Sequence, residues 1–284
     1  MANTRTRQAK RRRRRHHSTG AVIAVIIIVA LLLVAGAFGA LYFLGYRYTT
    51  IPLDNGLEVK FVGRVNDENT PVSGTLYYSD GIKAQISEDS DTVTYSNGDV
   101  YEGELKNFLR NGKGKLTFSS GAVYEGDFLD NKITGTGKYT FANGEVYEGE
   151  LVDGAKNGQG VFTYSDGTVY DGQFVNNAKQ GYGVYSWADG SRYEGEYVSD
   201  MKQGHGIFYF ANDEVYDGEF YGDYRSGYGT YTFANGDTYV GQFENNKIKG
   251  EGTYYFASGR IYTGTFDNGR IVRTETTDDI TLSE

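Results

Sequence analysis

The segment Val100–Gly121 reads VYEGELKNFLRNGKGKLTFSSG, and its pattern recurs every 23 residues. In its first part Tyr101, Gly103 and Leu105 alternate with polar positions, as residues on one face of a β-strand do. Residues 114–118 alternate in the same way. A helix would need apolar residues at 3.6-residue spacing and far less glycine. The unit is therefore predicted to form two short strands.

A Tyr-x-Gly triplet marks every unit, with no gap or insertion between units. The triplets begin at Tyr101, Tyr124, Tyr147, Tyr170, Tyr193, Tyr216, Tyr239 and Tyr262. Gly-x-Gly triplets lie between them and begin at Gly112, Gly135, Gly158, Gly181, Gly204, Gly227 and Gly250. A fixed period of this length indicates a repeat array, whose fold is determined by the single unit.

Turn dipeptides separate successive units. They include Asn143-Gly144, Asp166-Gly167, Asp189-Gly190 and Asn235-Gly236. Such dipeptides tolerate positive φ and favour tight two-residue hairpin turns between units. Inside the unit, a six-residue polar link is predicted to form a longer loop. One unit departs from the pattern, because Asp213 stands where the turn glycine is expected.

Aromatic residues form columns along the array. The first column is tyrosine in every unit, at the start of Tyr-x-Gly. The second column is Leu105, Phe128, Leu151, Phe174, Tyr197, Phe220, Phe243 and Phe266, and the third is Phe118, Phe141, Tyr164, Trp187, Phe210, Phe233 and Phe256. Glycine lacks Cβ, so a ring can lie flat over the backbone of a neighbouring strand. These rings are predicted to form the core.

The combination of Tyr-x-Gly, a following Gly-x-Gly and a turn glycine resembles the MORN repeat family. The resemblance covers eight units, over residues 97–268. It implies an all-β fold, an elongated single-layer antiparallel meander of hairpin repeats. It also implies binding or scaffolding rather than catalysis. Membrane or phospholipid contact has been proposed for relatives such as the junctophilins.

The N-terminus combines a basic segment with a long apolar run. Residues 1–20 hold eight basic residues and no acid, and Ala21–Leu44 has no charged residue. At ~1.5 Å per residue this run is about 36 Å long as a helix, enough for the ~30 Å hydrocarbon core. We therefore expect an uncleaved anchor followed by a tyrosine belt. A signal peptide cleaved near Ala35-Gly-Ala37 is the alternative.

The distribution of charge along the chain predicts the membrane topology and disfavours two classes of binding partner. Positive residues before a span favour a cytoplasmic N-terminus, which places the repeats outside the cell. An arginine run of this kind also occurs in nuclear signals and nucleic-acid patches, but directly before a span it is explained by topology. Residues 21–284 hold 20 basic and 37 acidic residues, a net charge of −17. That charge disfavours nucleic acid and broadly anionic membranes.

The charged residues also follow the repeat. One acidic column is Glu102, Glu125, Glu148, Asp171, Glu194 and Asp217, and a second is Glu104, Asp127, Glu150, Glu196 and Glu219. They are predicted to form a solvated face, with cation binding as the alternative. The predicted loops carry Arg110, Lys132, Lys156, Lys179, Lys202, Arg225 and Lys247. These residues are interpreted as edge protection, or alternatively as a basic ridge for an anionic polymer.

No catalytic, metal or cofactor site is predicted, and the protein is not expected to be an enzyme. The chain has no cysteine, and no nucleophile elbow or phosphate-binding loop occurs. His205 is the central residue of a Gly-x-Gly triplet, so it is a variant of the repeat. Every acid that could act in catalysis belongs to a repeated column, whereas a catalytic site needs unique groups.

The predicted organisation has five parts. They are a basic cytoplasmic segment (1–20), a transmembrane helix (21–46), a linker with degenerate repeats (47–96), the MORN array (97–269) and a C-terminal tail (270–284). Phe61 and Gly63 belong to the degenerate repeat, and a shortened hairpin is expected between Ala84 and Ser96.

Two functions fit this organisation. The first is a single-pass membrane scaffold at the cell envelope that binds a protein. The second is a module for a glycan, an anionic wall polymer or a phospholipid. The candidate binding surface is Tyr124, Tyr147, Tyr170, Tyr193, Tyr216, Trp187, Lys156, Lys179, Lys202 and Arg225. Buried rings would favour the scaffold, and several neighbouring rings along an open groove would favour the polymer.

The charge asymmetry generates a topology prediction. Protease added to intact cells or spheroplasts should digest the array and spare the N-terminal segment, as followed with tags at both ends. An array that stays protected until the membrane is permeabilised would contradict an external location.

Overall fold

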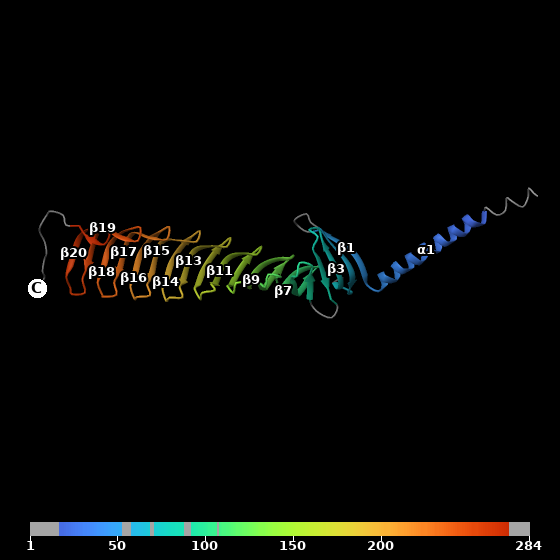
Figure 1. Ribbon diagram of the computed structural model, residues 1–284, viewed down its shortest axis with the longest axis horizontal. Helices are drawn as coiled ribbons and strands as arrows, with labels where there is room; N and C mark the ends of the chain where they lie inside the picture. The colour runs from blue at the N-terminus through green and yellow to red at the C-terminus, as the bar shows by residue number, and fades with distance from the viewer. Residues whose placement is uncertain (1–16, 53–57, 69–70, 88–91, 107, 273–284) are drawn as a thin grey trace, which may run out of the picture. The chain divides into compact units, whose positions relative to one another are not determined.

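The computed structural model describes residues 17–52, 58–68, 71–87, 92–106 and 108–272 (Figure 1). It divides into two units, residues 1–96 and residues 97–284. The first unit contains α1 (His17–Phe43), β1 (Tyr46–Pro52), β2 (Glu58–Val65), β3 (Pro71–Tyr78), β4 (Lys83–Ile86) and β5 (Thr92–Tyr95). These five strands pair antiparallel in chain order.

Helix α1 is apolar over its whole circumference from Ile23 to Phe43. Its segment Ile23–Phe43 is long and apolar enough to cross a bilayer, and in the part of the chain that the structure describes no other helix has this property. The side chains of this segment are exposed, and at its end the guanidinium of Arg47 lies 4.0 Å from the ring centroid of Tyr42. The helix is therefore compatible with a membrane anchor or a signal sequence. Residues 1–16 of the basic segment lie outside the described residues.

The first unit keeps the packing of the degenerate repeat. Gly63 pairs with Gly74, and the buried ring of Phe61 lies against both glycines. A phenylalanine thus takes the place of the repeat tyrosine. Strands β4 and β5 have only four residues each, which confirms the shortened hairpin.

The second unit is an antiparallel meander of hairpins, as predicted. Its strands are β6 (Val100–Lys106), β7 (Leu109–Thr117), β8 (Val123–Leu129), β9 (Lys132–Thr140), β10 (Val146–Val152), β11 (Ala155–Thr163), β12 (Val169–Val175), β13 (Ala178–Ser186), β14 (Arg192–Val198), β15 (Met201–Tyr209), β16 (Val215–Tyr221), β17 (Tyr224–Thr232), β18 (Thr238–Glu244), β19 (Lys247–Tyr255), β20 (Ile261–Asp267) and β21 (Arg270–Ile271). Each strand pairs with its neighbours in sequence, so the hairpins form a row (Figure 1).

The side chains of each strand alternate between two faces, which we call the aromatic face and the polar face. In β10 Tyr147 and Leu151 are buried on the aromatic face, whereas Glu148, Glu150 and Val152 are exposed on the polar face. The tyrosine column is therefore internal, although the sheet has one layer.

Glycines allow the tyrosine rings to lie on the sheet. Gly149 pairs with Gly137 on one side and Gly160 on the other. A Cβ on Gly160 would lie 2.5 Å from Cε2 of Tyr147, and a Cβ on Gly149 would lie 2.7 Å from its hydroxyl. Neither position has space for a side chain, so the predicted packing of tyrosine over glycine is confirmed.

The tyrosine hydroxyl is satisfied inside the same unit. In Tyr147 it donates to the backbone oxygen of Glu150, at 2.7 Å. Six other units repeat this bond to the third residue after the tyrosine: Tyr101 to Glu104, Tyr124 to Asp127, Tyr170 to Gln173, Tyr193 to Glu196, Tyr216 to Glu219 and Tyr239 to Gln242. A buried phenol without such a partner would lose the free energy of one hydrogen bond to water.

The two kinds of turn are the reverse of the sequence prediction. The link inside a unit is a two-residue turn such as Asp130-Asn131, with φ of 47° and 70°, whereas the link between units has five residues, as in residues 141–145. Two positive φ values are typical of a type I′ turn, and Asp and Asn tolerate them. In the longer link only one residue needs positive φ, usually glycine, and Asp213 adopts it with φ of 66°.

The glycine packing generates a stability prediction. Gly149→Val should destabilise its hairpin by about 1–3 kcal/mol, because the added atoms overlap the backbone and the Tyr147 hydroxyl. Hydrogen exchange of the backbone amides in β9–β11 would measure this local loss.

Glu148→Val is the matched control, because Glu148 lies on the same strand but points to the exposed polar face. Equal exchange in the Gly149→Val and control variants would show that the ring does not restrict this position.

Candidate functional site

The candidate tyrosines are not accessible. Tyr124, Tyr147, Tyr170, Tyr193 and Tyr216 each have an exposed fraction of 0%. They form the core, and the structure corrects their inclusion in a binding surface. The physical reason is the pairing of each ring with two glycines, which draws the ring onto the backbone. Burial also raises the pKa of the Tyr147 phenol to about 12.

A row of ring contacts covers the tyrosines and is continuous from Tyr147 to Phe266. Tyr170 contacts Phe174 of its own unit at 5.1 Å between ring centroids, and Tyr197 of the next unit at 5.3 Å. Both contacts are edge-to-face, a favourable geometry for aromatic pairs. The same pattern joins Tyr147 to Phe174 and Tyr193 to Phe220. These contacts hold each repeat to the next.

Trp187 belongs to a second row of rings and is half-buried. Its ring centroid lies 4.5 Å from that of Tyr185 and 5.2 Å from that of Phe208. Equivalent rings in neighbouring units contact each other in the same way, such as Tyr164 with Tyr185 at 5.8 Å. Trp187 thus packs mainly against its own array.

The candidate basic residues lie on strands, facing the aromatic side. Lys156 Nζ is 4.3 Å from the ring centroid of Phe162 in the second row and 5.3 Å from that of Phe174 in the first row. Lys202 Nζ lies 5.3 Å from the ring centroid of Trp187. The basic column Lys156, Lys179, Lys202 and Arg225 therefore runs between the two rows of rings.

The basic column corrects the prediction of a basic ridge on loops. These side chains cover the aromatic face with their hydrocarbon stems and place their charges over rings. Burial lowers the pKa of Lys156, Lys179 and Lys202, and it is partly opposed by nearby acids, Asp200 for Lys179 and Asp223 for Lys202. The lowered pKa values reflect removal of the ammonium groups from water. Sequence reasoning missed this role, because it placed these residues in a loop.

Two clefts open where the basic column is interrupted. Ile133 and Ile248 occupy its positions in their units, and beside them lie clefts of about 300 Å³ and 290 Å³. Arg110, Phe118 and Ile133 line the first, and the residues 115 positions later line the second. The clefts are thus the same site in units that are five repeats apart.

The family model for the MORN repeat matches seven consecutive units, residues 101–123, 124–146, 147–169, 170–192, 193–215, 216–238 and 239–259. The matched residues make up more than half of the chain. The chain belongs to the MORN repeat family. The structure adds an eighth unit, in which Tyr262 packs over Gly264 on β20.

Comparisons with known proteins add the following. No curated protein matches this MORN chain in sequence. The TCP10 domain of Danio rerio CPAP, solved in complex with a peptide of Danio rerio STIL, is 12% identical over 78% of this chain and 99% of that chain, with a TM-score of 0.39. The Drosophila melanogaster SAS-4 (dCPAP) TCP domain with a proline-rich motif of Ana2 is 14% identical over 77% of this chain and 90% of that chain, with a TM-score of 0.25. Scores this low carry no information on function.

The first acidic column of the MORN array lies on the polar face, where several members form ion pairs. Lys138 contacts Glu148 at 2.7 Å, and Lys115 contacts Glu125 at 3.5 Å. The ring of His205 lies 2.9 Å from Asp217. These exposed contacts stabilise the sheet only slightly.

The second acidic column has a structural role. After Gly149 pairs with Gly160, the next paired residues are Leu151 and Lys156, so Glu150 alone lies opposite three residues. The Glu150 carboxylate accepts a hydrogen bond from the backbone N–H of Gln159 at 2.9 Å. Gln242 provides the same acceptor for Glu251 at 3.1 Å. An acceptor oxygen rather than a charge is required there.

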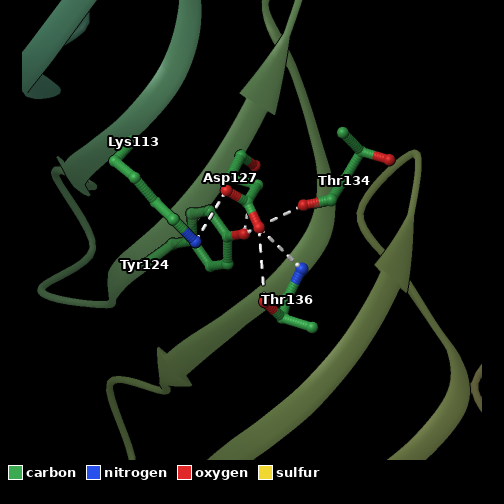
Figure 2. Close-up of polar contacts among 5 residues, drawn as sticks. All are labelled: Lys113, Tyr124, Asp127, Thr134 and Thr136. Carbon is green, nitrogen blue, oxygen red and sulfur yellow. Dashed lines mark hydrogen bonds and ion pairs between the residues drawn. The ribbon is translucent and has the colours of Figure 1, made fainter.

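Figure 2 shows this contact around Asp127. Its carboxylate accepts from the backbone N–H of Thr136 at 3.0 Å and from the Thr136 hydroxyl at 3.3 Å. Lys113 lies 2.7 Å from the other oxygen. The Lys113 contact, with help from Thr136, lowers the pKa of Asp127. Among the described residues, no group of three His, Asp or Glu side chains is placed to hold a metal ion.

The basic column generates a prediction about packing. Lys202→Ala should destabilise the array by about 1–2 kcal/mol, because it removes the stem and the charge that cover Trp187 and Phe208. Thermal unfolding followed by the near-UV signal of the single tryptophan would report it.

Lys202→Arg is the matched control, since arginine occupies the same column at Arg225 and lies over rings there. The control should unfold near the wild-type temperature. If the alanine variant does so too, the lysine is not part of the packing.

Proposed function

We propose that this protein is a membrane-anchored interaction scaffold of the cell envelope, whose MORN array lies outside the cytoplasm and binds a protein partner. The observation that carries the proposal is the internal use of the aromatic residues. Seven of the eight repeat tyrosines are fully buried, and the basic column lies over their rings and those of the second row. The array therefore resembles a rigid support, and its exposed faces are available for partners.

The N-terminal helix supports the anchored part of the proposal. A basic segment precedes an apolar helix of bilayer length. The arginine-rich side of a membrane span usually lies in the cytoplasm. The acidic array then extends from the outer side. Its charge keeps it away from anionic lipid headgroups.

Binding rather than turnover fits the chemistry of the repeat. The ionisable groups of the array recur in columns, whereas a catalytic site needs groups held in a unique arrangement. Similar contacts that are repeated along a surface instead add up to affinity.

A glycan or anionic polymer is the second candidate, favoured by the two clefts. Each cleft brings an arginine, an isoleucine and at least one aromatic ring to an open surface, with Phe118 in the first and Tyr231, Phe233 and Phe243 in the second. A chain that bridges both clefts would span five repeats, about 48 Å at two strand spacings per repeat. The burial of the tyrosines weakens this candidate, because it removes the largest set of rings on which sugars could stack.

Deletion of repeats tests the scaffold. Units should be removed in steps of 23 residues from residues 216–238 toward the N-terminus, with the anchor and the last unit kept. Each variant is tested for capture of proteins from envelope extract, of purified wall polymer and of phospholipid vesicles. The amount of captured protein should fall progressively as units are removed. Circular dichroism of each variant controls for folding. Preferential capture of polymer or vesicles would show that the partner is not a protein. If the full array captures nothing, the proposed scaffold function is wrong.

A further inference from the structure

An apolar stripe crosses the polar face beside the two-residue turns. Its members occupy the last position of one strand and the first position of the next in successive hairpins. The exposed stripe residues are Leu129, Val152, Val175, Val198, Met201, Tyr221 and Tyr224, with exposed fractions from 43% to 72%. They come from five hairpins in a row. At two strand spacings per hairpin, the stripe is about 38 Å long.

The stripe is confined to these hairpins. In the next two, the same positions pair Glu244 with Lys247 and Asp267 with Arg270. Ala155 and Ala178, which pair with Val152 and Val175, are small apolar residues in the middle of the stripe. None of these exposed side chains is required by the tyrosine packing, which lies on the opposite face. A row of exposed apolar residues on one surface is typical of an interaction site.

Acidic residues border the stripe on both sides in four of its five hairpins. Along the turns they are Asp130, Asp153, Asp200 and Asp223. Two residues before the last strand position, on the same face, they are Asp127, Glu150, Glu196 and Glu219. The middle hairpin, that of Val175, has Gln173 at this position and Asn176-Asn177 in its turn. Lys132 contacts Asp153 at 3.4 Å and Lys113 contacts Asp127, so the first two hairpins are partly neutralised. The hairpins of Val198 and Tyr221 have acids on both borders, and of these Asp223 lies 4.0 Å from Lys202.

We propose that this stripe binds an amphipathic helix of a partner protein, apolar along one side and lined by lysine or arginine along both flanks. The inference rests on the proposed scaffold and names the chemistry of its partner. Charge complementarity selects this occupant. The apolar ridge of such a helix covers the valines and tyrosines, and its basic flanks meet the two acidic borders.

The same borders oppose the two other occupants. A second copy placed stripe against stripe would bring acids against acids, which is unfavourable. An anionic membrane would be repelled by the turn carboxylates in the same way. Both therefore become outcomes of the test.

The probe is a fluorescent 18-residue helical peptide of leucine and lysine, with leucine on one side and lysine on both flanks. It is about 27 Å long as a helix and covers about three hairpins. The full chain in phosphatidylcholine nanodiscs is titrated, and anisotropy gives the Kd. A peptide with glutamate in place of lysine tests the charge, and one with serine in place of leucine tests the apolar side. Both should bind at least about tenfold more weakly.

Variants of the protein distinguish peptide binding at the stripe from nonspecific binding to other exposed apolar residues. Val152→Lys, Val175→Lys and Val198→Lys together should weaken binding of the leucine–lysine peptide at least about tenfold, because they remove apolar contact and add repulsion. The matched control changes Val240, Tyr255 and Ile261 to lysine. These residues are 41–60% exposed on the same array but outside the stripe, and their loss should change the Kd less than about twofold.

Three results would overturn the proposal. The first is that the two triple variants weaken peptide binding equally, and the second is that the glutamate peptide binds as tightly as the lysine peptide. The third is that the stripe forms dimers or binds phosphatidylglycerol vesicles and does not bind the peptide. The scaffold fails separately. If the stripe variant still captures the envelope proteins that the wild-type array captures, the scaffold stands and the stripe is not its site. If the wild-type array captures none, the scaffold itself is wrong.

Discussion

The fold of the array depends on a packing contact that recurs in each unit, in which a tyrosine ring lies over two paired glycines. The ring of Tyr147 occupies the space that Cβ atoms at Gly149 and Gly160 would fill, and its hydroxyl donates to the backbone oxygen of Glu150. A single-layer sheet has no second layer to bury its apolar face. This packing gives it a core, because the ring lies against the backbone itself and leaves only its outer surface to be covered.

Every other regular feature follows from this contact. The second column, which is aromatic in all units except those of Leu105 and Leu151, covers the outer side of the tyrosines, and one ring serves two units, as Phe174 does for Tyr147 and Tyr170. The basic column covers what the rings leave open. Where Glu150 lies opposite three residues, its carboxylate satisfies the backbone N–H that loses its partner. Stability is thus shared between neighbours, as is typical of repeat proteins.

This use of side chains limits where function can reside. Aromatic and basic residues are common at binding sites, yet here most of them form the core and its cover. What remains exposed is the polar face, with its acidic columns and the apolar stripe beside the turns, together with the two clefts on the aromatic face. A repeat protein can change such positions from unit to unit without disturbing the packing, as the change from Val175 to Tyr221 at one position shows. Differences between units are therefore a better guide to partners than the shared pattern.

The sequence alone determined the fold class, the 23-residue repeat and the buried tyrosine column. The 23-residue period and the glycines at fixed distances from Tyr147 leave few other arrangements, since only glycine accepts a ring on the backbone. Only the tertiary structure decided the turns and the place of the charges. Lys156 falls on a strand rather than a loop because three residues opposite Glu150 absorb the extra length, and no local pattern shows this. The stripe, too, exists only once successive hairpins bring Val152, Val175 and Val198 side by side, 23 residues apart in the chain.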